Sequence, residues 1–386
     1  MNPAIIRDMM TQLVHRGPDA EGIYCHGPVG LGHRRLSIID LSPLGKQPMT
    51  NEDQSVYLVI NGEIYNHQTL RTHLEKKGHH FQSKSDSEVV LHLYEEMGTD
   101  LLSRIYGMFG LAIWDERRQR LFIARDRIGQ KPLFYSVTPK GIFFGSEIKG
   151  LLKCPDINLD IDLEALHHYL TFKYIPHPNS IYQGVRKLPP AHFLLFEAGK
   201  SRIEKYWDLD YKNKRKGSLK ELKAEFLHYF EDAVKIRMMS DVPLGAFLSG
   251  GIDSSATVAM MSKLSKQPVK TFSIGFDDHA YNEVVYARKI ARLFHTDHHE
   301  FIVRPNATEV LPKLIWHYDE PYADPSAIPT YYLSQMTRQA VTVALNGDGG
   351  DESFAGYDRY LADRLAGLYI LLPGWSGPGR GQTAIT

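Results

Sequence analysis

Short apolar runs separated by turn residues fill the first half of the chain. Examples are Val29–Gly32, Val56–Ile60, Leu111–Trp114 and Leu121–Ala124. Bounded by Gly, Pro, Asn and Asp, such runs are typical of stacked antiparallel sheets. Helical spacing appears in two stretches, Gln68–Lys77 and Asp86–Met97, and Asp86 is of a type favoured at helix N-caps. The pattern predicts an α+β domain.

The pattern changes after the polar, basic segment 212–217, which we interpret as a solvated linker. Helical periodicity covers Leu219–Met239, and strand, loop and helix then alternate. The predicted strands are Gly245–Leu248, Val269–Gly275 and Val341–Leu345, and the predicted helices are Ser254–Leu264 and a stretch through Ala287–Ala291. This repetition predicts a parallel α/β sheet. We expect domains at 1–205 and 206–370, followed by a disordered tail at 371–386.

Composition narrows the class of protein. The 386 residues contain 43% hydrophobic and 23% charged residues, which is typical of a globular protein. Lys plus Arg and Asp plus Glu both number 45, so the basic excess of a nucleic-acid binder is missing. Two cysteines, Cys25 and Cys154, cannot form a disulfide framework, and no apolar run is long enough to span a membrane. We expect a cytoplasmic protein without a nucleic-acid or membrane partner.

A candidate phosphate loop lies between the predicted strand at 245–248 and the next helix. It reads Ser249-Gly250-Gly251-Ile252-Asp253-Ser254-Ser255. Paired glycines leave backbone N–H groups accessible, and the helix N-terminus that follows favours an anion. Asp253 fits as a ligand of the Mg²⁺ that accompanies phosphates. The loop lacks the Gly-Lys-Ser/Thr of the Walker pattern.

A second loop, rich in glycine and acids, follows the predicted strand at 341–345. It reads Asn346-Gly347-Asp348-Gly349-Gly350-Asp351-Glu352. In open α/β sheets ligands bind at the carboxyl ends of strands, so we expect Asp351 to share the Mg²⁺ with Asp253 and Asp348 to act on the reacting group. The alternative is a glycine-rich turn with solvated acids.

Three motifs in the first half combine charged and amide side chains with a glycine. They are Arg35-Leu36-Ser37-Ile38-Ile39-Asp40, Asn61-Gly62-Glu63-Ile64-Tyr65-Asn66 and Ser85-Asp86-Ser87-Glu88. An arginine can bind a carboxylate bidentately, and a glycine permits close backbone approach. The alternatives are a simple helix cap at Asp86 and a hairpin turn at Asn61-Gly62.

Taken together, the motifs resemble those of glutamine-dependent asparagine synthetases. Ser249–Ser255 resembles the pyrophosphate loop of ATP pyrophosphatases, and the motifs of the first half, with His15-Arg16-Gly17-Pro18-Asp19, resemble class-II glutaminases. The resemblance implies an Ntn-hydrolase-like αββα sandwich followed by an α/β ATP-pyrophosphatase domain. It implies ATP and Mg²⁺ as cofactors, with aspartate and glutamine or ammonia as substrates. A homodimer is possible.

The resemblance also implies residue roles. It implies Asp348 as the catalytic residue that supports formation of an aspartyl-adenylate, and Asp253 and Asp351 as metal ligands. The implied glutamine site comprises Arg35, Leu36, Ser37, Ile38, Ile39, Asn61, Gly62, Glu63 and Asp86. The implied ATP site comprises Phe247, Leu248, Ser249, Gly250, Gly251, Asp253, Ser254, Ser255, Ile274, Asn346 and Gly347. At Asn346 the family usually has Ser.

The glutaminases of this family use an N-terminal cysteine as nucleophile, whereas Met1 is followed here by Asn2 and Pro3. We interpret Cys25 as a core thiol and expect an inactive glutaminase in a chain truncated at both ends. Three alternatives stay open. They are a β-lactam synthetase-like enzyme, an amidotransferase for another acid such as one used in polysaccharide assembly, and a non-catalytic nucleotide-binding remnant.

Several histidines and acids could be taken for metal-binding or substrate-binding residues. We interpret the stretch 295–300, His79-His80 and His167-His168 as structural or solvated, because none has the spacing of a helical zinc pair. The acids of the loop 318–325 are equally compatible with substrate binding and with turn formation.

Overall fold

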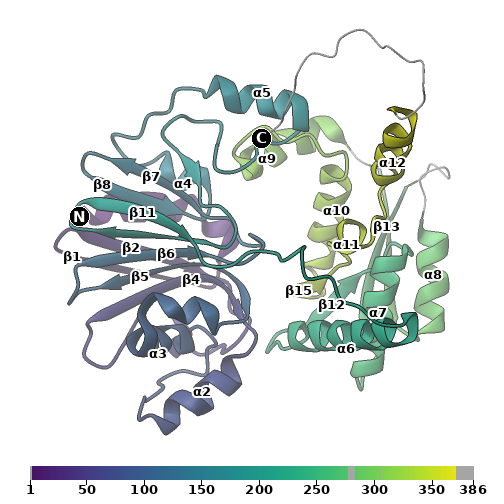
Figure 1. Cartoon of the computed structure of the whole chain (residues 1–386), viewed down its shortest axis with the longest axis horizontal. Helices are drawn as coiled ribbons and strands as arrows, with labels where there is room; N and C mark the ends of the chain where they lie inside the picture. Colours follow the sequence, from purple (N-terminus) through teal and green to yellow (C-terminus); the bar gives the residue numbers. More distant parts are fainter. Residues whose placement is uncertain (1, 277–282, 305, 371–386) are drawn as a thin grey trace. The chain divides into compact units, whose positions relative to one another are not determined.

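The computed structural model describes residues 2–276, 283–304 and 306–370 (Figure 1). The predicted tail at 371–386 lies outside this range. Two compact units divide the chain, and each consists of two segments. The first unit comprises Met1–Leu244 and Val303–Val343, and the second comprises Gly245–Ile302 and Ala344–Thr386. Within the described residues, no helix combines the length and apolar composition needed to cross a membrane.

A six-stranded antiparallel sheet forms the centre of the first unit, in the order β11-β10-β6-β5-β4-β3. Its longest pairing joins β4 to β5, from Val56 opposite Asp115 to Ile64 opposite Gly107. The apolar run of β4 is nearly continuous because both faces of this sheet are covered. The strands are β3 (Met49–Thr50), β4 (Val56–Ile64), β5 (Gly107–Asp115), β6 (Arg120–Arg125), β10 (His192–Glu197) and β11 (Lys200–Lys205).

One face of this sheet packs on helices. Leu58 of β4, Ile113 of β5 and Phe122 of β6 share a buried core with Leu74 and Tyr94 of the helical layer. The helices are α2 (His67–Lys76), α3 (Glu88–Met97) and the 3-10 helix η3 (Gly98–Ser103). Figure 1 shows α2 and α3 together on this side of the sheet.

The opposite face packs on two smaller antiparallel sheets. Val59, Trp114 and Ile123 of the large sheet contact a core that includes Leu31 of β2 and, partly buried, Tyr135 of β7. The smaller sheets are β1-β2 and β8-β7-β9. Their strands are β1 (Ala20–His26), β2 (Val29–Arg35), β7 (Phe134–Thr138), β8 (Gly141–Gly145) and β9 (Arg186–Lys187).

A second helical layer covers the outside of the smaller sheets. Met9 of α1 packs on the buried cluster that contains Phe143 of β8 and Ile148 of α4. Helix α1 spans Pro3–Thr11 and α4 spans Ile148–Leu151. The order helix, sheet, sheet, helix confirms the predicted αββα sandwich.

The first unit also contains helices outside the sandwich. They are α5 (Leu163–Phe172), α6 (Leu219–Arg237), α9 (Ala307–Tyr318), α10 (Ala327–Thr337) and the 3-10 helices η1 (Val14–Arg16) and η2 (Pro43–Gly45). A capping box between Ser218 and Glu221 starts α6 close to the predicted position. The segment 212–217 before it is exposed and lies outside helices and strands, which agrees with a solvated linker.

One helix start was predicted wrongly. Helix α3 begins at Glu88, two residues after Asp86, and the N-cap position belongs to Ser87 without a side-chain hydrogen bond. The Asp86 carboxylate instead accepts a hydrogen bond of 2.6 Å from the Ile64 amide of β4. A partner distant in sequence therefore replaces the local cap.

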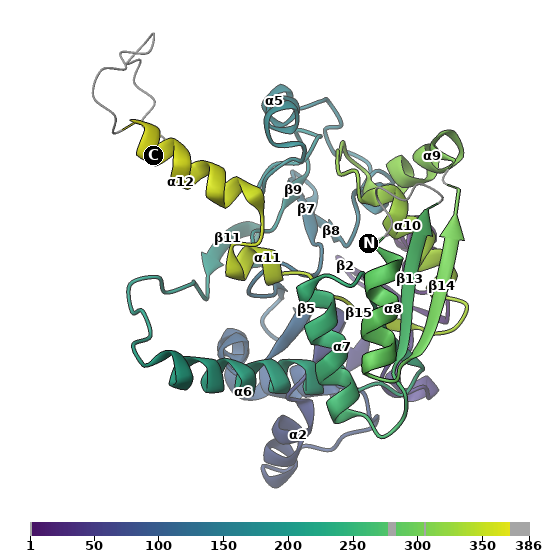
Figure 2. The ribbon, with the colours of Figure 1, turned by 90° about the vertical axis from the view of Figure 1, so that its right-hand side faces the viewer.

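A four-stranded sheet in the order β14-β13-β12-β15 runs through the second unit. Strands β12 (Leu244–Phe247) and β13 (Lys270–Phe276) pair in parallel, as predicted. The other strands are β14 (Asp297–Val303) and β15 (Val343–Leu345), and the helices are α7 (Ile252–Leu264), α8 (Val284–Leu293), α11 (Gly350–Phe354) and α12 (Asp358–Ile370). Figure 2 shows α7 and α8 side by side next to these strands.

The loop after α9 is held by buried ion pairs within the first unit. Lys149 Nζ lies 2.9 Å from Asp319 Oδ1 and also pairs with Glu147, while Lys187 pairs with Glu320. Glu147 in turn accepts a hydrogen bond of 2.9 Å from Arg16 Nη1. The two acids at the start of the 318–325 loop are therefore ion-paired, an arrangement that the sequence did not predict.

Lys149 pairs with two carboxylates whose pKa values are shifted in opposite directions. Burial opposes ionisation of Glu147, but hydrogen bonds from Lys149 and Arg16 outweigh it and lower the pKa of this carboxyl. For Asp319 burial dominates, and the pKa is raised despite Lys149. Removing the ammonium would leave both carboxylates buried without compensation.

We predict that Lys149→Ala lowers the free energy of unfolding by about 3–5 kcal/mol, because it breaks a buried ion pair by removing one partner. Urea unfolding of the full chain measures this loss. Lys153→Ala, at an exposed position four residues on, is the control and should change stability by about 0.5 kcal/mol or less. A loss as small as that of the control would contradict the prediction.

Candidate functional sites

The predicted phosphate loop connects β12 to α7. Gly250 has a φ of +88°, and a Cβ there would lie 2.6 Å from the backbone N of Ala287 in α8. Both facts require glycine at this position. Gly251 is the N-cap residue of α7, so the loop ends at the N-terminus of a 13-residue helix.

Serine hydroxyls close the loop on itself. The Ser249 and Ser254 hydroxyl oxygens lie 2.9 Å apart, and the Gly251 amide donates to Ser249 Oγ at 3.2 Å. The Ser255 hydroxyl is buried without a hydrogen-bond partner. Buried hydroxyls are rarely unpartnered, so this group points to a missing ligand.

The acidic loop after β15 lies directly against the phosphate loop. A Cβ at Gly350 would lie 2.2 Å from Cγ of Asp253, and one at Gly347 would lie 2.7 Å from the Ser254 amide nitrogen. Only the absence of a side chain at these two glycines allows the loops to meet. The structure therefore brings Asp253 together with the loop that carries Asp348 and Asp351.

Strand order explains why these two loops meet. In the order β14-β13-β12-β15, the chain moves outward from β12 to β14 and then returns to the other side of β12. Open α/β sheets bind ligands at such a reversal, where loops diverge from the carboxyl ends of neighbouring strands. The phosphate loop follows β12 and the acidic loop follows β15, so both border this point.

The acids form a region of crowded negative charge. Partial burial, then the charges of Asp351 and Glu352, raise the pKa of Asp253. Carboxylate oxygens are the ligands that Mg²⁺ prefers, and a divalent cation would relieve this repulsion. These residues thus fit the metal that the resemblance implies. The sequence assigned Glu352 no role, although its position beside Asp351 in an acid-rich loop was a signal.

The other predicted ATP-site residues lie around these loops. Asp348 accepts a hydrogen bond of 2.7 Å from the Asn346 side-chain amide, which gives Asn346 a contact through its side chain. Phe247 and Ile274 are half-buried on the adjacent strands β12 and β13. Leu248 is buried at the end of β12.

In the first unit, two predicted glutamine-binding acids lie close together at the end of β4. Burial, then the charge of Asp86, raise the pKa of Glu63, while nearby Lys131 lowers it in part. Burial also raises the pKa of Asp86, against the Ile64 hydrogen bond that favours the carboxylate. A half-buried carboxylate close to a buried one suits a cationic ligand such as an ammonium group. Lys131 was missed because it lies far from both acids in the sequence.

Arg35 makes different contacts from those predicted for a glutamine ligand. Its Nη1 donates to the Ser42 carbonyl at 2.8 Å, and its Nη2 donates to the Asp40 carbonyl. Arg35 therefore holds the loop that contains Leu36, Ser37, Ile38 and Ile39. In this loop the Ser37 amide donates to Asp19 at 2.8 Å. A role for Arg35 toward glutamine stays a prediction.

Next to these residues lies an apolar cavity of about 110 Å³. It is lined by residues of α1, β2, β8 and the large sheet, including Asn61 and His33. The Asn61 Nδ2 and His33 Nδ1 atoms are buried without a hydrogen-bond partner. Burial lowers the pKa of His33 to about 4, so its ring is neutral. Gly62 is required beside the cavity, because a Cβ there would lie 2.1 Å from the Met108 carbonyl oxygen.

Neither cysteine is placed as a nucleophile. Cys25 pairs with Gly30 in the β1-β2 hairpin, and Cys154 is buried with its pKa raised to about 11 by burial. Neither lines the cavity beside Asn61. Near the chain start, Asn2 Oδ1 accepts a hydrogen bond of 3.0 Å from the Ala4 amide and so caps α1.

The histidines differ in their surroundings. His298 and His299 lie on β14, where His298 Nδ1 contacts the Thr271 hydroxyl at 2.9 Å and His299 stacks on Phe272. These contacts agree with a structural role. His79, by contrast, lies beside Glu52 and His92 in a cluster that no sequence motif predicted.

Comparison with known proteins matches the two halves of the sequence to two families. Residues 1–207 match the glutamine amidotransferase domain family, and residues 225–377 match the asparagine synthase family. A putative glutamine-hydrolysing asparagine synthetase 2 of Methanocaldococcus jannaschii is 41% identical over 384 residues, which cover 92% of this chain and 73% of the relative. This chain belongs to the glutamine-dependent asparagine synthetase family.

A second relative is matched over a smaller share of its own length. Asparagine synthetase [glutamine-hydrolyzing] 1 of Bacillus subtilis is 38% identical over 358 residues, so this chain spans about half of that relative, 56% of its length. Among solved structures, the allosteric regulatory enzyme of purine biosynthesis covers 89% of this chain and 87% of its own, at 14% identity and a TM-score of 0.42. That likeness is too weak to carry an argument.

We predict that Glu63→Gln stabilises the first unit at neutral pH. In the wild type the raised pKa makes folding favour the protonated acid, so stability falls as the pH rises above the ordinary value of 4.5. The gain from the variant should be absent below that pH and grow as the pH rises toward the raised pKa. Thermal unfolding from pH 4 to pH 9 measures it.

Glu164→Gln, at an exposed position of α5, is the matched control and should show no such growth with pH. If Glu63→Gln lowered stability equally at every pH, the two carboxylates would not repel each other in the folded chain.

Proposed function

We propose that this protein forms an amide from a carboxylate and ammonia at the expense of ATP, with aspartate as acceptor and asparagine as product. The observation that carries the proposal is the contact of the acidic loop with the phosphate loop, where Gly350 meets Asp253. This contact gathers carboxylates beside a helix N-terminus that favours phosphate. The phosphates of ATP would complement the helix N-terminus, and Mg²⁺ would complement the carboxylates.

The roles of the residues follow from this complementarity. Backbone amides of Ser249–Ser255 would bind the pyrophosphate portion of ATP, and Phe247 and Ile274 would flank the adenine. Asp253 and Asp351 would hold Mg²⁺, which neutralises phosphate charge when bound. Asp348, oriented by Asn346, would contact the reacting carboxylate or amine.

The reaction we propose has two balanced steps. An oxygen of the aspartate side-chain carboxylate attacks the α-phosphorus of ATP, and pyrophosphate leaves to give β-aspartyl-AMP. Ammonia then attacks the acyl carbon, AMP leaves, and a proton is released from the new amide nitrogen. Amide groups of the phosphate loop would stabilise the departing pyrophosphate.

The first unit would supply nitrogen from glutamine. Glu63 and Asp86 suit the α-ammonium group, Arg35 would hold the α-carboxylate, and Asn61 with Gly62 would form the oxyanion site. No described cysteine lines the cavity beside Asn61. We therefore propose that this chain uses free ammonia and hydrolyses glutamine poorly or not at all.

Other acceptors and other roles are distinct outcomes of the test. Exchange that depends on a different carboxylic acid would favour an amidotransferase of the β-lactam synthetase or polysaccharide type. ATP binding without any acid-dependent exchange would indicate a non-catalytic nucleotide-binding protein. The homodimer and the cytoplasmic location stay predictions.

The amide-forming half is tested by aspartate-dependent exchange of labelled pyrophosphate into ATP. We expect exchange in the wild type, and a loss on the order of 100-fold in Asp348→Asn and in Gly350→Ala. In Gly350→Ala the added Cβ would collide with Asp253 and separate the two loops. Gly367→Ala is the control, since a Cβ there meets nothing within 4 Å, and it should retain full exchange.

Wild-type exchange without aspartate, or full exchange in Gly350→Ala, would overturn the proposed reaction. Aspartate should not be the only acid tried, because a structurally similar acid could replace it in the assay.

The glutamine half is tested separately by glutamate release from glutamine. We expect no saturable release by this chain, whereas ammonium salts should support asparagine formation. Cys25→Ser and Cys154→Ser should leave both results unchanged, because neither thiol lies at the cavity. Saturable release that Cys25→Ser abolishes would mean that the β1 thiol is the nucleophile after all.

A further inference from the structure

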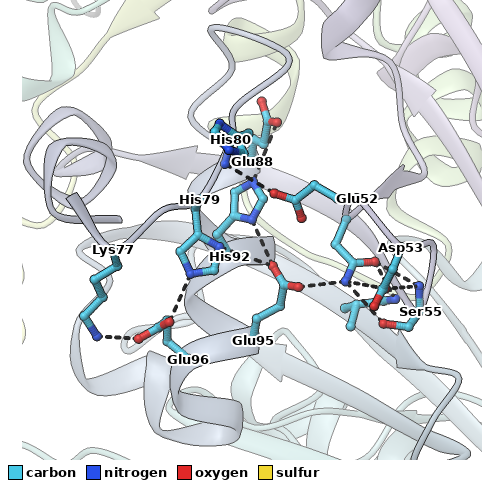
Figure 3. A network of polar contacts seen from close by, with 12 residues as sticks. Glu52, Asp53, Ser55, Lys77, His79, His80, Glu88, His92, Glu95 and Glu96 are labelled. Atoms are coloured by element: carbon cyan, nitrogen blue, oxygen red, sulfur yellow. Dashed lines mark hydrogen bonds and ion pairs between the residues drawn. The ribbon is translucent and has the colours of Figure 1, made fainter. Parts of the chain in front are cut away.

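Glu52, His79 and His92 converge in the first unit, away from the residues assigned above. Figure 3 shows them with the acids that surround them. Glu52 lies in the loop between β3 and β4, His79 follows α2, and His92 lies on α3. One ligand atom of each residue lies within 4.8 Å of the corresponding atoms of the other two.

His92 is the most informative member of this cluster. The residue is 1% exposed, and its Nδ1 contacts Glu95 Oε2 at 2.9 Å. Its Nε2 is buried without a hydrogen-bond partner, and the Glu88 carboxylate at 3.8 Å is too far to provide one. Leaving such a nitrogen unsatisfied costs free energy, so the buried ring has one nitrogen available to a ligand.

His79 repeats the same arrangement. Its Nε2 contacts Glu96 Oε1 at 3.1 Å, while its Nδ1 lies 3.7 Å from Glu95, beyond hydrogen-bond distance. In each ring one nitrogen contacts a carboxylate and the other is left for a ligand. Metal-binding histidines have this pattern, because the carboxylate fixes the tautomer and orients the ring.

Glu52 supplies an oxygen at the solvent side. Its Oε1 accepts the His80 amide at 3.2 Å, which anchors the side chain next to His79. Glu52 is exposed, whereas His92 is buried. The three residues thus span from the interior to the surface, so an ion could reach them from the side of Glu52.

We propose that Glu52, His79 and His92 bind one divalent transition-metal ion, with Zn²⁺ as the best match to two imidazoles and a carboxylate. Three protein ligands and a solvent position suit the tetrahedral preference of Zn²⁺. Mg²⁺ is a poor match, since it prefers oxygen ligands. The site does not depend on the proposed function.

Such an ion would fasten three segments that are distant in sequence. It would join the β3-β4 loop to the end of α2 and to α3. Glu88, one turn before His92, accepts the Gln82 amide at 2.7 Å and the Ser83 amide at 2.8 Å. That segment leads to Asp86. We therefore assign the ion a positioning role toward the loop that carries Asp86, with no part in the chemistry.

A proton is the alternative occupant. Burial disfavours the charged ring of His92, but the neighbouring Glu88 and Glu95 outweigh it and raise the pKa to about 9. The test must therefore distinguish a bound metal from a protonated histidine in a network of acids. A metal binds with a measurable stoichiometry, and Co²⁺ has a visible absorption spectrum, whereas a protonated histidine shows neither.

The experiment uses the full chain after treatment with EDTA. Zn²⁺ is titrated by calorimetry, and Co²⁺ is used as a probe whose visible absorption reports its coordination. We expect one Zn²⁺ per chain at this site and a rise in melting temperature. His92→Gln and Glu52→Gln should each weaken Zn²⁺ binding tenfold or more. Glu52→Gln changes an exposed loop residue, so it keeps the test valid if His92→Gln does not fold.

Matched controls separate this site from other ligand groups. His73→Gln removes an exposed histidine of α2 and should leave binding unchanged. His298→Gln and Asp253→Asn alter the β14 histidines and the predicted Mg²⁺ site, and should also leave it unchanged. Absence of stoichiometric Zn²⁺ binding, or binding that persists in both His92→Gln and Glu52→Gln, would overturn the proposal.

Discussion

The antiparallel ladder between β4 and β5 is the constraint on which the first unit depends. Every residue from Val56 to Ile64 has a partner in β5, which fixes which side chains face the helices and which face the smaller sheets. The ladder also continues through Gly62, where the Met108 carbonyl leaves no room for a Cβ. Both ends of β4 border residues with a proposed role. Its first residues follow the loop of Glu52, and its last residues bring Glu63 beside Asp86.

In the second unit, glycines likewise allow two loops to approach each other closely. The acidic loop can reach the phosphate loop only because Gly347 and Gly350 lack side chains. Charge works against this arrangement, since Asp253, Asp351 and Glu352 repel one another. The folded chain therefore holds like charges close together, and a bound divalent cation would relieve their repulsion.

Local sequence signals predicted much of this, and contacts between distant segments account for the failures. Alternating strand, loop and helix after residue 218 predicted the parallel sheet, and the Gly250-Gly251 pair predicted the tight turn between β12 and α7. Asp86 looked like a helix cap, but the Ile64 amide bound its carboxylate instead. His79 and Glu52 carry no mutual spacing that a sequence pattern could reveal, because α2 lies between them. Asp319 is similar, since its partner Lys149 lies 170 positions away.

The ion pair between Lys149 and Asp319 also bears on how modular this protein is. The segment Val303–Val343 belongs to the first unit, although the strands on either side of it, β14 and β15, belong to one sheet with β12 and β13. The polypeptide therefore passes between the two units three times. A protease that cuts the exposed segment 212–217 would cut within the first unit and sever none of these connections. The two units would stay joined by all three passages, and neither unit could be exchanged between proteins as one uninterrupted stretch of gene.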